Sequence, residues 1–140
     1  METATTCYES LVEPLLPSLP ELARCRSLAE LEAHPLYRKL RPQFEAALAA
    51  VDTGGPSRTT AAPARPAYRA VAWNIERGIA FEGQLHALRT HPSLCGCDVL
   101  LLTEADLGMA RSANRAVAQE LARELGMYYA FAPCYLNLTK

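Results

Sequence analysis

The chain has 140 residues and a net charge of −1, and half of its residues are apolar. This composition is ordinary for a soluble globular protein, and the length allows one modest core with an appendage. No basic stripe indicates a nucleic-acid surface. The N-terminus lacks a secretory signal, and no apolar run approaches the ~20 residues needed to cross a bilayer. We therefore expect a cytoplasmic protein with no membrane span.

The first part of the chain, residues 1–51, predicts a helical N-terminal extension. Prolines divide the first twenty residues into short pieces, and residues 21–32 form a better helix. We expect His34 to begin the next helix rather than to bind a ligand. That helix is the strongest of the extension, because it carries a narrow apolar stripe of Leu36, Leu40, Phe44, Leu48 and Val51. The stripe must lie against the rest of this chain or against another protein.

Residues 52–67 predict a flexible linker. The segment contains two glycines and three prolines, and it has no large apolar side chain to bury. It therefore separates the helical extension from a second domain at residues 68–140.

The second domain begins with a strand and a helix. Apolar and small residues alternate from Tyr68 to Glu76, which is typical of a strand, and residues 81–90 predict a short helix. Four consecutive apolar residues then lie between Asp98 and Thr103, and this run predicts a strand buried on both faces. A strand, helix and strand in this order favour a parallel pair.

The end of the chain predicts one more helix and one more strand. Ser112 is a suitable N-cap for a helix that runs to Leu125, and Gly126 is placed to end it. The aromatic and apolar segment 127–133 is typical of a third strand.

Glu104 follows the apolar run directly, where its strand leaves the sheet. Ligands of open α/β sheets collect at the carboxyl ends of the strands. A carboxylate that is buried at such a place needs its charge compensated, either by a bound cation or by an arginine. The alternative is a surface glutamate that only ends the strand.

Asn74 lies near the end of the preceding strand, so parallel strands would bring it to the same edge as Glu104. Taken alone, an asparagine here is typical of a residue that caps a turn. A carboxylate oxygen and an amide oxygen at one spot suit a hard divalent cation such as Mg²⁺, which fills its other positions with water and phosphate oxygens. We therefore predict that Glu104 and Asn74 bind Mg²⁺.

The loop after Glu104 carries Asp106, Arg111 and Arg115 and leads into the N-terminus of a helix, which favours anions. Arg111 and Asp106 are therefore candidates for binding a substrate phosphate. The alternative is that Arg111 or Arg115 forms an ion pair with Asp106.

Three segments together resemble a known group of enzymes. Residues 73–76 (Trp-Asn-Ile-Glu), residues 98–104 and the loop 105–115 are similar to the first half of the endonuclease/exonuclease/phosphatase superfamily. The resemblance implies an α/β fold, a partial two-sheet αββα sandwich of the deoxyribonuclease I type, preceded here by the helical extension. It also implies that Asn74 and Glu104 are catalytic residues of a Mg²⁺-dependent phosphodiesterase or phosphatase, with Mn²⁺ as a substitute metal.

The resemblance leaves the substrate open among nucleic acid, phospholipid headgroups and sugar phosphates. The superfamily's general-base aspartate and phosphate-binding histidine belong to later motifs, and its domain needs about 200–250 residues. We therefore expect residues 68–140 to be the N-terminal half of such an enzyme and to be inactive alone. The alternative is a non-catalytic interaction module whose N-terminal helices bind a protein partner.

Overall fold

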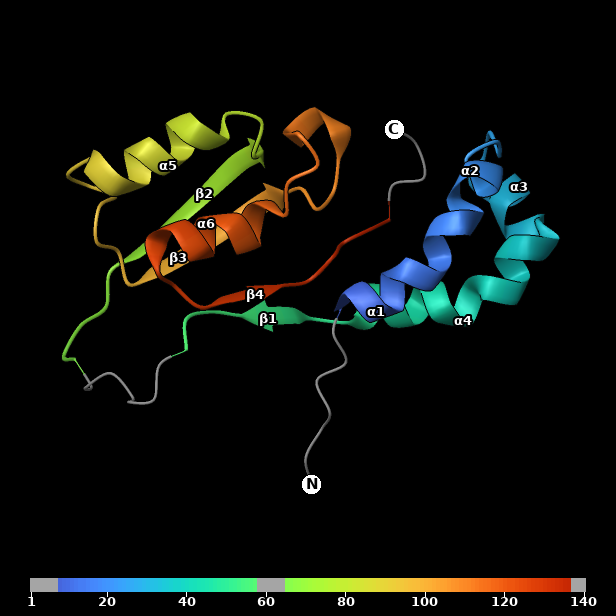
Figure 1. The fold of residues 1–140 in the computed structure, drawn as a ribbon, viewed down its shortest axis with the longest axis horizontal. Coiled ribbons are helices and arrows are strands. Elements are labelled where there is room, and N and C mark those ends of the chain that lie inside the picture. Colours follow the sequence, from blue (N-terminus) through green and yellow to red (C-terminus); the bar gives the residue numbers. More distant parts are fainter. Residues whose placement is uncertain (1–7, 58–64, 137–140) are drawn as a thin grey trace, which may run out of the picture. The chain divides into compact units, whose positions relative to one another are not determined.

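The computed structural model describes residues 8–57 and 65–136 and shows a mixed α/β protein (Figure 1). Its contacts divide the chain into two compact units. The N-terminal unit contains the first 52 residues together with the segment that follows Ala130, and the C-terminal unit contains residues 53–130. In the described ranges, no helix combines the length and the apolar character that a membrane span requires.

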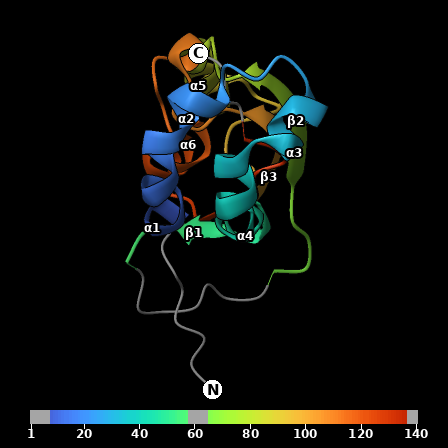
Figure 2. The same cartoon turned by 90° about the vertical axis from the view of Figure 1, so that its right-hand side faces the viewer.

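The N-terminal unit is helical, as predicted. Pro14 and Pro20 each stand in the first turn of a short helix, and Pro17 lies inside the first of these. Proline is tolerated in a first turn because the amide hydrogen it lacks has no partner there. Figure 2 shows the helices of this unit, which are α1 (Tyr8–Val12), the 3₁₀ helix η1 (Glu13–Ser18), α2 (Leu19–Leu22), α3 (Leu28–Ala33) and α4 (Pro35–Ala49).

The apolar stripe of α4 is partly covered by its own unit. Phe44 is buried among Leu15, Leu22 and Ala47, whereas Leu48 and Val51 at the end of the stripe are exposed. The prediction that His34 begins a helix is confirmed, because its Nδ1 accepts a hydrogen bond from the backbone N–H of Leu36 at the start of α4.

The C-terminal unit is built around two strands and two helices. It contains β2 (Ala70–Arg77), α5 (Phe81–Thr90), β3 (Val99–Ala105), η2 (Ala110–Ser112) and α6 (Val117–Leu125). The predicted parallel pairing is confirmed, because β2 and β3 pair in parallel from Ala70 opposite Val99 to Asn74 opposite Thr103. Two further strands, β1 (Asp52–Gly54) and β4 (Tyr129–Phe131), pair with each other.

The first three residues of the predicted flexible linker form the strand β1. Its glycines allow close approach to aromatic rings, since a Cβ atom on Gly54 would lie 2.6 Å from Cε1 of Tyr129. A Cβ atom on Gly55 would clash in the same way with the ring of Tyr128. The glycines therefore fit a strand that packs against aromatic side chains, and residues 58–64 of the predicted linker lie outside the described residues.

The predicted N-cap at Ser112 is wrong. Ser112 ends η2, and its hydroxyl donates to the carbonyl of Met109. Ala113 and Asn114 then adopt positive φ angles of 57° and 58°, so the chain cannot continue as a right-handed helix, and α6 begins only at Val117. The predicted helix end is confirmed at Gly126, whose φ is 65°.

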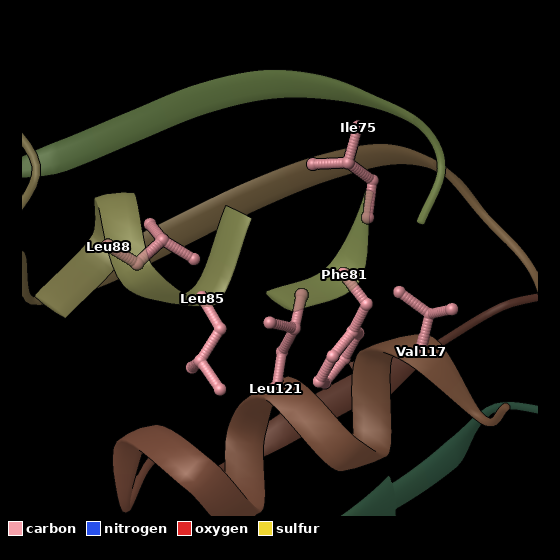
Figure 3. Packing of buried hydrophobic residues seen from close by; sticks show 6 residues of the cluster. All are labelled: Ile75, Phe81, Leu85, Leu88, Val117 and Leu121. Carbon is pink, nitrogen blue, oxygen red and sulfur yellow. The ribbon is translucent and has the colours of Figure 1, made fainter. Parts of the chain in front are cut away.

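Helices α5 and α6 cover one face of the β2–β3 sheet. Figure 3 shows the apolar side chains that meet there, and Leu121 of α6 is 1% exposed. The cluster consists of Ile75, Phe81, Leu85, Leu88, Val117 and Leu121. Because side chains alternate along a strand, Trp73 and Ile75 of β2 and Leu100 and Leu102 of β3 point into this core.

The prediction that β3 is buried on both faces is wrong. Leu100 and Leu102 pack against the core, but Val99 is 40% exposed and Leu101 is 58% exposed. Within the described residues, helices cover this sheet from one side only. The four apolar residues of β3 therefore include two that contribute to an open apolar face.

This one-sided burial predicts unequal costs for the same substitution. Leu121→Ala should lower the free energy of unfolding by about 2–5 kcal/mol, because it leaves a cavity in the core. Leu101→Ala should lower it by less than about 0.5 kcal/mol, because that side chain already contacts solvent. Urea unfolding followed by the fluorescence of Trp73, the single tryptophan, measures both. Equal losses for the two variants would show that the open face is covered in solution.

Candidate functional site

The structure brings Asn74 and Glu104 into direct contact at the ends of the two parallel strands. The Asn74 Nδ2 atom donates a hydrogen bond to Oε1 of Glu104, with 3.0 Å between the two atoms. Asn74 stands opposite Thr103 in the register, so its neighbour across the sheet is the residue before Glu104. The predicted juxtaposition of these two residues is therefore present.

The hydrogen bonds of Asn74 fix the orientation of its amide group. Its Oδ1 atom accepts the backbone N–H of Glu76 at 3.0 Å, while its Nδ2 atom faces the Glu104 carboxylate. A flipped amide would place oxygen against oxygen and N–H against N–H, so only this orientation satisfies both partners. Asn74 thus caps the turn and also orients Glu104.

Glu104 is an exposed residue, so water can solvate its charge. No lysine or arginine in the described ranges forms a salt bridge with it. Geometry rather than burial is therefore what favours a ligand at Glu104. One carboxylate oxygen is held by the Asn74 amide, and the group lies where ligands of parallel sheets collect.

The backbone beside this pair is strained. Glu104 has a φ of 58°, which is unusual for a residue in a strand, and it lies opposite a bulge in β2. The register advances three residues on β2, from Asn74 to Arg77, but only two residues on β3. Strained backbone of this kind costs on the order of 1–3 kcal/mol for each residue and clusters at functional sites.

The bulge continues into a tight turn of residues 75–78, which we call the 75–78 turn. The N–H of Gly78 donates to the carbonyl of Ile75 at 2.9 Å, and Glu76 and Arg77 between them have φ angles of 45° and 65°. Two successive positive φ angles are typical of a type I′ turn, which strongly prefers asparagine and glycine. Two charged residues stand there instead.

Contacts from the helices hold the 75–78 turn. Gln84 of α5 is 8% exposed, and its Nε2 atom donates to the carbonyl of Ile75 at 2.7 Å. Gly78 passes so close to α6 that a Cβ atom would lie 2.6 Å from Cγ2 of Val117. The turn is therefore fixed by the same helices that form the core.

Asp106 and Arg111 form an ion pair with each other. The Nε atom of Arg111 donates to one carboxylate oxygen at 2.8 Å and a terminal nitrogen donates to the other at 2.7 Å. The hydrogen bond from Arg111 lowers the pKa of the buried Asp106 carboxyl below its usual value, although burial acts in the opposite direction. The hydroxyl of Ser112 and the charge of Arg77 add to the lowering.

Arg115 forms ion pairs with α5 and α6 rather than with Asp106, and it thereby connects the loop to both helices. It donates to Glu120 of α6 at 2.7 Å and to Glu82 of α5 at 3.0 Å, and its guanidinium lies 4.3 Å from the centre of the Phe81 ring. The arginines of the loop thus stabilise its position on the core.

The described residues contain no group of three or more His, Cys, Asp or Glu side chains that could hold a metal ion. Mg²⁺ does not require such a group, because it commonly uses one or two carboxylates and retains several waters. The exposed Glu104 carboxylate therefore suits Mg²⁺ better than a metal that needs a closed protein site.

A separate hollow of about 770 Å³ lies in the N-terminal unit, where η1, α2 and α3 line it. Its charged residues have both signs, and Nε2 of His34 lies 3.6 Å from Oε1 of Glu21. Neither Asn74 nor Glu104 lines this hollow, so the hollow is not part of their site.

Comparison of the chain with protein-family models, with curated proteins and with solved structures gave no match.

Sequence reasoning missed Glu76, Arg77 and Gln84. Nothing in the local sequence indicates a left-handed turn, because Glu and Arg avoid that conformation. Gln84 appears in the sequence as an ordinary polar residue of a helix, and only the packing of α5 shows that it is buried. The one available signal was Gly78, which follows the predicted strand directly.

The Asp106–Arg111 pair predicts a pH-dependent stability difference. Asp106→Asn should lower the free energy of unfolding at pH 7 by about 1–3 kcal/mol, because it removes the charged carboxylate that accepts two hydrogen bonds from Arg111. Since the folded-state pKa is lowered, the stabilisation is complete above the unfolded pKa of about 4 and is lost as the pH falls through the folded value. Urea unfolding at pH 7 and below pH 4 measures the difference.

The control for this variant is Glu82→Gln, which removes an exposed acid from an ion pair with Arg115. It should change the stability by less than about 1 kcal/mol. A stability difference between wild type and Asp106→Asn that stays constant from pH 7 to pH 3 would contradict the assignment.

Proposed function

We propose that this chain provides the metal-binding part of a Mg²⁺-dependent phosphoester hydrolase of the endonuclease/exonuclease/phosphatase type, with the partial two-sheet sandwich of that superfamily. The observation that carries the proposal is the hydrogen bond from Asn74 to Glu104 at the carboxyl ends of two parallel strands. The strained backbone of Glu104 supports it, because such strain is typical of functional sites.

Each residue of the pair has a separate role in this proposal. Glu104 holds the metal through its exposed carboxylate, and Asn74 fixes the direction of that carboxylate through Nδ2. The amide oxygen of Asn74 is engaged by the backbone of Glu76, so we assign Asn74 as a positioning residue rather than a direct ligand. A bound Mg²⁺, or Mn²⁺ in its place, supplies positive charge that stabilises a phosphate group under attack by water.

The ion pair changes the roles proposed for Asp106 and Arg111. Both carboxylate oxygens of Asp106 accept hydrogen bonds from Arg111, so the two side chains are already engaged with each other inside the loop. We propose that these two residues stabilise the loop beside the metal site and do not bind the substrate phosphate.

The proposed substrate class is a phosphate ester. The resemblance covers nucleic acid, phospholipid headgroups and sugar phosphates, and the phosphate group is what they share. The resemblance also assigns the water-activating aspartate and the phosphate-binding histidine to later motifs. The proposal for this chain therefore concerns binding of the metal, and turnover requires the complete site.

A non-catalytic interaction module is the second candidate. The observation that favours it is the open apolar face of β2 and β3, where Leu101 is 58% exposed, because such faces mark contact surfaces. The α4 stripe gives it less support, since Phe44 is buried within its own unit. A pure interaction module has no reason to bind a divalent metal at Glu104, so metal binding distinguishes the two candidates.

The proposal predicts a localised metal effect. Mn²⁺ added to the isotope-labelled 140-residue chain should broaden the NMR signals of the backbone amides around Asn74 and Glu104, and excess Mg²⁺ should reverse the broadening. Glu104→Gln should abolish the effect, because it removes the anionic ligand. Asn74→Ala should weaken binding by about tenfold, the usual effect of losing an outer-shell partner.

The matched control is Glu13→Gln, which makes the same change in charge at an exposed position of the N-terminal unit. It should leave the broadening unchanged. Broadening that persists in Glu104→Gln, or that spreads evenly over all acidic residues, would refute the proposed metal site.

A further inference from the structure

Arg77 differs from the other arginines of the C-terminal unit. Among the residues that the structure describes there, each of the other arginines has a hydrogen bond or an ion pair, whereas none is formed by the Arg77 side chain. The partnered arginines are Arg65, Arg69, Arg89, Arg111, Arg115 and Arg123. Arg77 is exposed and retains all of its donors for an external ligand.

The parallel register places the backbone of Arg77 beside the candidate metal site. It stands opposite Ala105 in the parallel register, and Ala105 directly follows Glu104. The positive charge of Arg77 also acts on Asp106, the next residue along the loop. An arginine without a hydrogen bond or ion pair of its own in the part of the chain that the structure describes therefore stands across the sheet from the residue that follows Glu104.

The backbone conformation of Arg77 is energetically unfavourable, and the local sequence does not explain why the chain adopts it. Its φ of 65° in the 75–78 turn is the left-handed conformation, which is unfavourable for a residue with a side chain relative to the right-handed one. Glycine or asparagine would form this turn with less strain. An exposed arginine that forms no hydrogen bond or ion pair within the described residues is therefore a poor choice for stability, and an external anion would account for it.

We propose that Arg77 binds the phosphate group of the substrate beside the metal held by Glu104. This inference rests on the proposed function and adds the residue that recognises the anion. A guanidinium suits the task because it donates two parallel hydrogen bonds to phosphate oxygens and is always charged. The metal and Arg77 would together neutralise a group that carries one or two negative charges.

The test uses inorganic phosphate as the probe, titrated into the Mg²⁺-loaded 140-residue chain and followed by the NMR shifts of the backbone amides. In the wild type, the shifts should concentrate in the 75–78 turn and around Glu104. Arg77→Gln should weaken phosphate binding by about tenfold or more, as expected for the loss of a charge-assisted contact. Arg77→Lys should retain part of the affinity, because it keeps the charge but loses the fork of donors.

Two further variants separate binding from folding. Arg123→Gln removes the same charge from an exposed position on α6 and should leave phosphate binding unchanged. Arg77→Gly should abolish phosphate binding and yet raise the melting temperature by about 2–4 °C, because glycine relieves the left-handed strain. A fall in the melting temperature would overturn the argument from strain.

The outcomes distinguish this inference from the proposed function. If Mn²⁺ and Mg²⁺ bind at Glu104 but Arg77→Gln leaves phosphate affinity unchanged, the role of Arg77 is refuted and the metal site stands. If neither metal binds at Glu104, the proposed function itself fails. Phosphate binding that depends on Arg77 without added metal would support the anion site alone.

Discussion

The hydrogen bond between the Asn74 amide and the Glu104 carboxylate is the interaction on which the account of this protein depends. It exists because β2 and β3 run in parallel, so that both side chains emerge at the same end of the sheet. The extra residue in the bulge of β2 then lets the backbone N–H of Glu76 reach back to Asn74. The oxygen of the Asn74 amide is thus held by the backbone of Glu76, while its nitrogen orients the Glu104 carboxylate.

The core and the site constrain each other through the 75–78 turn. Gln84 and Val117 belong to the helices that bury Ile75, and they also hold the backbone of the turn in its left-handed conformation. Packing therefore supplies the free energy that keeps the strained residues in place. The opposite face of the sheet stays open and apolar, which leaves the edge that carries Glu104 accessible.

The sequence predicted the features that depend on local patterns. The bounds of α5, the parallel pair and the helix end at Gly126 follow from periodicity and glycine placement, and all three are present. Hydrophobicity alone could not show that Leu101 faces outward, because a run of four apolar residues is the same whether one face or both are covered. Similarly, the glycines that indicated a linker also allow a strand to pack against aromatic rings.

The candidate site was predictable only in its two central residues, because the 75–78 turn is imposed by tertiary contacts against local preference. The most direct test of the central claim is diffraction from crystals of the chain soaked with Mn²⁺, using anomalous scattering to locate the ion. The account predicts a peak about 2 Å from a carboxylate oxygen of Glu104, with the Asn74 amide still donating to that carboxylate. Strong peaks at other carboxylates with none at Glu104 would contradict it.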